Sequence, residues 1–257
     1  MRGRHRHFNP VHAGANSSFD GRFISGLADD ASMSDWTGRA GSALTPSQAT
    51  ANNQPKYKVS AINGQPGVYF DDGGTAANGK FFQATTSVTS NAAACLTVAQ
   101  KTANVGSATY ARVAAIWNNA NNVASPGDFG STNSLIFAFL ANATFSGFNP
   151  STAAYRNSAD LATTSYTVGD SIITGTVIDG TTVTFSKNGV AGTASTSATA
   201  LNSDRLRIGA APYVGSGGDS NMRGYIVRVD FFINALTEPL RRRIERGAGY
   251  CFKLACS

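Results

Sequence analysis

Short runs of β-favouring residues alternate with turn-rich segments along most of the chain. The runs that we expect to form strands are 80–88, 93–99, 109–117, 135–145 and 225–233. The segments between them are rich in Asn, Gly, Ser and Pro, which supply the backbone angles that tight turns require. Runs of this length and spacing are typical of an all-β sandwich. The pattern therefore predicts an all-β protein.

Two tight turns follow one another in the second half of the chain. Residues 171–178 and 181–186 flank Asp179-Gly180, a dipeptide typical of a type I′ hairpin, and Asn188-Gly189 repeats the signal. Val183 and Phe185 alternate with polar residues in the second of these runs. The alternation predicts a meander of antiparallel strands with one buried face and one solvent-exposed face.

The C-terminal segment changes to a helical period. Thr237 is placed to be an N-cap, and Pro239 follows where the first turn tolerates a missing N–H. The apolar positions recur every four residues: Leu240, Ile244 and Ala248. We expect the arginines to occupy the other faces of a short helix that ends at Gly247 and Gly249.

Composition supports one large domain. The chain has 257 residues, of which 42% are hydrophobic and only 14% are charged. All-β sandwiches of more than 200 residues commonly form a single domain, and this share of apolar residues is enough for one sizeable core. The low charge implies a surface covered largely by Asn, Ser, Thr and Gly, which suits strands and turns better than helices.

Positive charge is concentrated at the two ends of the chain, although the net charge is only +6. Residues 1–18 form a basic, turn-rich segment that we expect to be an extended arm, followed by one domain at 19–257. Arg2, Arg4 and Arg6 are the candidate docking residues of this arm, for an acidic protein partner rather than nucleic acid. No apolar run is long enough to cross a membrane, and the basic start lacks the apolar segment of a secretory signal.

Two groups of short motifs, at opposite ends of the predicted domain, resemble the concanavalin A-like, laminin G-like family. The opening motifs are Ser25–Ala31, Asp35–Gly41, Asn53–Tyr57, Ile62–Pro66 and Val68–Asp71. The closing motifs are Gly224–Phe232, Leu236–Glu238 and Arg242–Glu245. The resemblance spans roughly residues 19–254 and implies a jelly-roll β-sandwich with a short C-terminal helix, in which the first and last strands pair. It also places Trp36 in a buried strand.

The residues that catalysis would need are poorly placed. The two glutamates, Glu238 and Glu245, both lie in the predicted helix, whereas glycoside hydrolases of this fold class need paired carboxylates on a strand. The three histidines all lie within the first twelve residues, outside the expected core. Cys95 lies in an apolar run, and a bridge between Cys251 and Cys256 is left open. We therefore expect no enzymatic activity.

Two kinds of binding site have candidate residues. An aromatic side chain next to amide groups is typical of sugar binding, and the candidates are Trp117, Asn119, Asn121 and Tyr213. The family resemblance implies Ca²⁺ at the rim of the sandwich. The loop carboxylates that could bind Ca²⁺ are Asp71, Asp128 and Asp219, with turn formation as the alternative role.

From these features we expect a non-enzymatic structural protein of a bacteriophage virion, such as a capsid decoration, head fibre or tail component. The expected partners are other virion proteins, held through the basic arm, further copies of the chain in a homo-oligomeric assembly, and host-surface glycans. The expected location is the virion. The alternatives are a free carbohydrate-binding lectin-like module and a divergent glycoside hydrolase.

Overall fold

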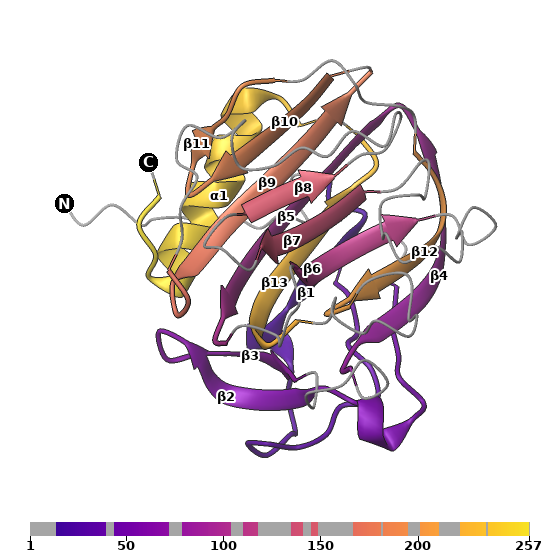
Figure 1. Ribbon diagram of the computed structural model, residues 1–257, viewed down its shortest axis with the longest axis vertical. Helices are drawn as coiled ribbons and strands as arrows, with labels where there is room; N and C mark the ends of the chain where they lie inside the picture. Colours follow the sequence, from indigo (N-terminus) through magenta and orange to yellow (C-terminus); the bar gives the residue numbers. More distant parts are fainter. Residues whose placement is uncertain are drawn as a thin grey trace.

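A computed structural model describes residues 14–39, 44–71, 79–103, 110–117, 135–140, 145–148, 167–180, 182–194, 201–210, 222–234 and 236–256. Within these residues the chain forms two β-sheets and one α-helix (Figure 1). The prediction of an all-β protein with a short C-terminal helix is therefore confirmed. No helix in this part of the chain combines the length and the apolarity needed to cross a membrane.

The larger sheet has eight strands. Seven follow the order β11-β10-β9-β5-β13-β3-β2, and β1 pairs with β13. Their bounds are β1 Ser17–Asp20, β2 Lys56–Ile62, β3 Gln65–Phe70, β5 Ala92–Lys101, β9 Ser171–Asp179, β10 Thr182–Lys187, β11 Val190–Ala191 and β13 Gly224–Phe232. The antiparallel pairing of β1 with β13 confirms that the first and last strands meet. Because β1 begins at Ser17, the sheet includes the last two residues of the segment that we assigned to the arm.

The smaller sheet has five strands in the order β4-β12-β6-β7-β8. Their bounds are β4 Phe82–Ser90, β12 Leu201–Ile208, β6 Tyr110–Trp117, β7 Leu135–Leu140 and β8 Phe145–Phe148. The strands expected at 80–88, 93–99, 109–117 and 225–233 correspond to β4, β5, β6 and β13. The run 135–145 instead contains all of β7 and the first residue of β8.

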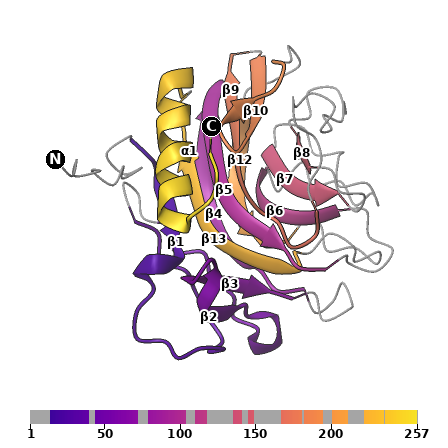
Figure 2. The ribbon, with the colours of Figure 1, turned by 90° about the vertical axis from the view of Figure 1, so that its left-hand side faces the viewer.

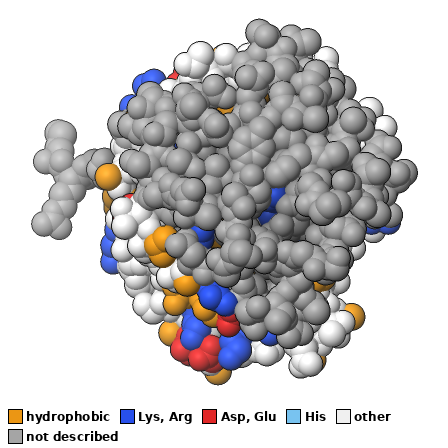
Figure 3. Space-filling model, viewed as in Figure 1, with side chains coloured by type: hydrophobic (Ala, Val, Ile, Leu, Met, Phe, Trp, Pro, Cys, Tyr) orange, Lys and Arg blue, Asp and Glu red, His pale blue; other side chains and the backbone are white. Residues whose placement is uncertain are grey.

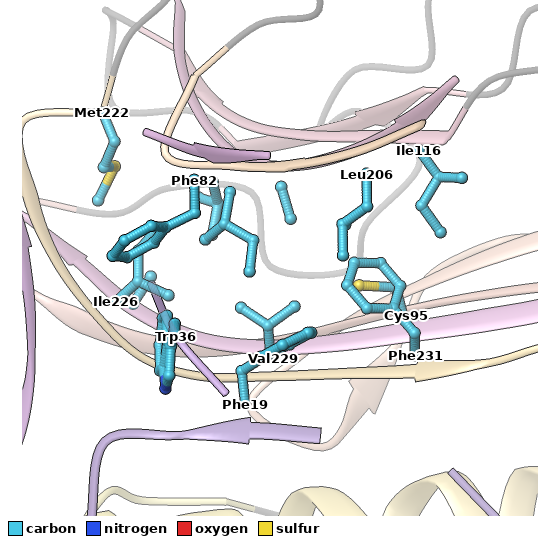
Figure 4. Packing of buried hydrophobic residues seen from close by; sticks show 14 of the residues in the cluster. Phe19, Trp36, Phe82, Cys95, Ile116, Leu206, Met222, Ile226, Val229 and Phe231 are labelled. Carbon is cyan, nitrogen blue, oxygen red and sulfur yellow. The ribbon is translucent and has the colours of Figure 1, made fainter. Parts of the chain in front are cut away.

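The main hydrophobic core lies between the two sheets. In Figure 4, Leu206 and Ile116 of the smaller sheet point toward Cys95 and Phe231 of the larger sheet. Trp36 is 1% exposed and packs edge-to-face on Phe82, with ring centroids 6.2 Å apart. Trp36 is buried as predicted, but it lies outside the strands rather than in one, and Cys95 in its apolar run is fully buried. Burying a large apolar side chain stabilises a fold by about 1.5–3 kcal/mol.

Helix α1, Glu238–Phe252, lies on the outer face of the larger sheet, so the molecule has three layers (Figure 2). Ile244 packs with Val177 and Phe232, and Ala248 and Phe252 pack with residues of β5, β9 and β13. The middle strands are therefore buried on both faces. The prediction of a solvent-exposed face for the meander is wrong at Ser186, whose hydroxyl lies under α1 and donates to Glu245.

The helix differs from the sequence-based prediction in two ways. It continues through Gly247 and Gly249 to Phe252 because the Phe252 side chain is fully buried against the sheet. Gly249 instead allows the tail to fold back: a Cβ there would lie 2.9 Å from the Cβ of Cys256. In addition, Arg241 is 1% exposed and faces the sheet, whereas we expected the arginines on the other faces.

Two hairpins of the larger sheet show the expected turn chemistry. Asn188 and Gly189 both have positive φ, 49° and 89°, which confirms a type I′ turn between β10 and β11. In the preceding hairpin Asp179 pairs with Thr182. Asp179 is therefore part of the strand rather than of the turn, because the strand pairing extends one residue further than the turn signal suggests.

Candidate functional site

Three residues lie side by side on the outer face of the larger sheet, beyond the end of α1. Lys56 on β2 lies opposite Tyr69 on β3, and Tyr69 lies opposite Tyr225 on β13. Residues directly opposite one another in antiparallel strands point to the same face. Tyr225 packs against the apolar cluster under α1, which identifies this face as the outer one. The two tyrosine rings are 5.2 Å apart between centroids.

A groove of about 540 Å³ lies next to this row. Its lining residues include Asp30, Asn52, Lys56, Lys58, Tyr69, Asp71 and Lys80. Charged side chains of both signs gather at the lower edge of the space-filling view, where β2 lies in the ribbon (Figure 3). The groove therefore combines an aromatic side chain with hydrogen-bond donors and acceptors.

A salt bridge forms one wall of the groove. The Nζ of Lys58 lies 2.8 Å from Oδ1 of Asp30, and the Nζ of Lys56 lies 3.7 Å from the same oxygen. The hydrogen bond between Lys58 and Asp30 raises the pKa of Lys58 and lowers the pKa of Asp30. Both groups are therefore charged at neutral pH.

The remaining polar groups of the groove are also oriented by contacts. The Nζ of Lys80 donates to the backbone carbonyl of Asn52, and the Nε of Arg223 lies 3.6 Å from Oδ1 of Asp71. Burial, and secondarily the charge of Asp71, raises the pKa of Tyr69. The phenol of Tyr69 is therefore neutral near pH 7 and can donate a hydrogen bond.

Of the predicted sugar-binding residues, none has a described side chain. Trp117 is the last residue of β6, but its side chain lies outside the described part of the structure. Asn119, Asn121 and Tyr213 lie outside the described residues entirely. The same is true of Arg2, Arg4 and Arg6, the predicted docking residues of the arm.

Of the three predicted calcium ligands, only Asp71 lies within the described residues, so the calcium site stays a prediction. Asp71 lies beside the Arg223 guanidinium, and Asp128 and Asp219 fall outside the described residues. In the described ranges there is also no group of three or more His, Cys, Asp or Glu residues that could hold a metal ion. Asp71 lines the groove.

Both glutamates lie far from the groove lining, in α1. Glu245 is fully buried, and its Oε2 lies 2.6 Å from Nη1 of Arg241. Glu238 lies 2.8 Å from Nη2 of the same arginine. The hydroxyl of Ser186 also donates to Glu245. No disulfide joins Cys251 to Cys256.

Four residues of the site were not among the predicted sugar-binding residues: Lys56, Lys58, Tyr69 and Tyr225. A signal for the two lysines exists, because Lys56 and Lys58 occupy alternate positions of one strand, and Tyr69 lies two residues before Asp71 at the end of the next. What the pattern does not show is that these two strands are neighbours and that α1 leaves their outer face uncovered.

Comparison with known proteins identifies similar folds but no family. No protein-family model matches the chain, and no curated protein is significantly similar in sequence. Among solved structures, Trypanosoma rangeli sialidase is similar with a TM-score of 0.52 and 11% identity, over 93% of this chain and 33% of the sialidase. The same sialidase in complex with sialic acid has a TM-score of 0.53 and 12% identity, over 91% of this chain and 33% of the sialidase.

The binding domain of botulinum neurotoxin serotype G is also similar, with a TM-score of 0.57 and 8% identity, over 93% of this chain and 51% of that one. This chain therefore spans about a third of the sialidases and about half of the toxin chain. At such low identities the likeness shows a shared fold alone.

These structures correct the predicted function. We expected a structural protein of a bacteriophage virion, but the similar solved structures described above are sialidases and a toxin binding domain. The prediction of a virion structural protein is therefore wrong. The predicted virion partners and homo-oligomeric assembly have no support, and the predicted location in a virion is untested.

Proposed function

We propose that this chain is a carbohydrate-binding module with a concanavalin A-like jelly-roll sandwich, which binds a glycan in the groove beside Tyr69 and does not cleave it. The two sheets and the C-terminal helix support the choice of fold. The finer assignment to the jelly-roll type depends on the family motifs at the two ends of the domain.

The observation that carries the proposal is the tyrosine pair at the edge of a polar groove. A pyranose ring has apolar C–H faces that pack on aromatic rings, and hydroxyls that need donors and acceptors at its edge. Tyr69 supplies a ring supported by Tyr225, whereas Lys56, Asn52 and Asp71 supply polar groups in the same groove.

The similar solved structures agree with a glycan-related role. One is described as a sialidase in complex with sialic acid, and another as the binding domain of a neurotoxin. This support is an analogy of fold, since the same fold can carry unrelated functions. The proposal therefore depends mainly on the residues of the groove.

The state of the carboxylates favours binding without hydrolysis. Apart from exceptions such as sialidases, whose nucleophile is a tyrosine, a glycosidase uses one carboxylic acid that donates a proton and one carboxylate that acts as base or nucleophile. Lys58 lowers the pKa of Asp30, which makes Asp30 a poor proton donor. Glu238 and Glu245 both contact Arg241, and neither lines the groove.

The test is a glycan array probed with the full chain, followed by calorimetry on each glycan that binds. Tyr69→Leu and Tyr225→Leu keep apolar bulk but remove the aromatic face, and we expect each to weaken binding about tenfold, equivalent to about 1.4 kcal/mol. Tyr250→Leu is the matched control, because Tyr250 is a 60% exposed tyrosine on α1 outside the groove lining.

Thermal unfolding must first show that each variant folds like the wild type. A folded Tyr69→Leu protein that binds every glycan at wild-type strength would place the site elsewhere. Release of new reducing ends from a bound glycan would contradict the non-enzymatic part of the proposal.

A further inference from the structure

The charges in the groove are unequal in number. Three lysines line it, with Arg223 close behind, whereas the lining carboxylates are Asp30 and Asp71. Lys58 is the closest partner of Asp30, and Arg223 contacts Asp71. Each carboxylate of the groove therefore already has a nearby cation. Two lysines, Lys56 and Lys80, are not the closest cation of either carboxylate.

Those two lysines, Lys56 and Lys80, are the ones whose charge is least balanced by their contacts. Lys56 lies 3.7 Å from Asp30, at the limit of an ion pair, and its side chain is 45% exposed. Lys80 donates to a backbone carbonyl, which orients the ammonium group without neutralising it. Lys56 is also the cross-strand neighbour of Tyr69, and both residues line the groove in which we place the sugar.

We propose that the groove selects acidic sugars, with a carboxylate on the pyranose bound by Lys56 and Lys80 while the ring packs on Tyr69. This inference rests on the proposed glycan-binding function and names its ligand class. A neutral sugar would leave both ammonium groups with only their present contacts, whereas a carboxylate accepts charge-assisted hydrogen bonds from them. The Lys58–Asp30 pair and Asp71 remain available for the hydroxyls.

The experiment compares sugars that differ only in charge. Calorimetry on the full chain uses trigalacturonate against its methyl ester, and sialyllactose against the methyl ester of its sialic acid, so that the two arms separate hexuronic from nonulosonic acids. We expect at least one acidic sugar to bind about tenfold more tightly than its neutral counterpart, since two lysines act together. The preference should shrink at high salt, because exposed charges are screened.

Lysine variants then locate the preference. Lys56→Gln and Lys80→Gln should each reduce the acidic-over-neutral ratio by about fivefold while binding of the neutral sugar stays nearly unchanged. Lys253→Gln is the matched control, because Lys253 is an exposed lysine at the end of α1. A ratio that is unaffected by both groove variants would overturn the inference.

Two further outcomes separate this inference from the proposed function. Equal binding of the charged and neutral sugars, with loss in Tyr69→Leu, would overturn acidic selectivity and leave glycan binding intact. Absence of binding to every sugar on the array and in both arms would overturn the proposed function itself, and acidic selectivity with it.

Discussion

The outer face of the larger sheet has two regions with similar side chains and opposite surroundings. Under α1, Arg241 and Glu245 form an ion pair in which both side chains are at most 1% exposed. Over β2, Lys58 and Asp30 form an ion pair whose side chains are 22% and 54% exposed. Both pairs join a cation to a carboxylate with a closest nitrogen–oxygen distance below 3 Å, and they differ most in their surroundings.

Burial decides what each pair can do. A buried pair must satisfy its own charges, and removing one partner leaves the other desolvated, so the pair is tied to the packing of the helix. An exposed pair contributes little to stability, but its groups can exchange water for a ligand. The helix-covered region is therefore structural, and the open region is where binding can occur.

The largest expected effect comes from breaking the buried pair. Glu245→Gln removes the buried one of the two carboxylates that pair with Arg241, and we expect it to lower the free energy of unfolding by about 3 kcal/mol. Urea unfolding followed by circular dichroism measures the loss. The double variant Arg241→Met, Glu245→Met should be less destabilised than Glu245→Gln, and a larger loss in the double variant would contradict this explanation.

A smaller loss is expected where the sheet meets the helix. Gly175 of β9 has no side chain, and a Cβ there would lie 2.6 Å from both Glu245 Oε1 and Ser186 Oγ. Gly175→Ala should therefore push these groups apart and cost about 1–3 kcal/mol by urea unfolding. The control is Ala92→Ser, at a half-buried position at the start of β5. A glycine such as Gly26 would not serve, because its positive φ would strain any side chain placed there.

At the exposed end of the same ionic network the effect depends on pH. Hydrogen bonding to Arg241 lowers the pKa of Glu238 from 4.5 to about 2. Since the folded-state pKa is the lower one, its stabilising contribution is present above about pH 4.5 and is lost as the pH falls toward 2. Glu238→Gln should cost less than about 1 kcal/mol at pH 7, because Glu238 is 46% exposed.

The measurement is the difference in unfolding free energy between wild type and Glu238→Gln as a function of pH. This difference should shrink below pH 4.5, and a difference that is constant down to pH 2 would contradict the assigned pKa.

The smallest effect is expected in the open region. Asp30→Asn breaks the exposed pair with Lys58, and we expect a change of no more than about 0.5 kcal/mol in the free energy of unfolding. A loss comparable to that of Glu245→Gln would show that the two regions do not differ as described. The same variant leaves Lys58 without its closest carboxylate, so it should raise affinity for an acidic sugar in the calorimetric assay.

Much of the fold follows from local patterns in the sequence. The strands β4, β5, β6 and β13 and the turn at Asn188-Gly189 were predictable because alternation and turn chemistry act over a few residues. The errors have a common cause. The end of α1, the burial of Arg241 and the burial of Ser186 all depend on the contact between the helix and the sheet, and Ser186 lies 59 residues from its partner Glu245.

The candidate site was less predictable than the fold. Asp71 was predicted as a metal ligand and lies in the groove, whereas Tyr69 and Lys56 were noted only within the family motifs. The candidates Trp117 and Asn119 were chosen because an aromatic residue lies next to amide residues along the chain. The groove instead takes its residues from β2, β3 and the segments around Asp30 and Lys80, which are distant in sequence.

The sequence by itself determined the class of fold, the closing helix and the absence of paired strand glutamates, because these depend on composition and on short-range periodicity. Only the tertiary structure decided which second faces of the strands are exposed to solvent. Helix α1 covers one part of the larger sheet and leaves the part over β2 and β3 open. An ion pair is therefore buried under the helix in one place and lines an open groove in the other. Alternation of apolar and polar residues indicates one buried face of a strand, but burial of the other face depends on whether a further layer packs on it.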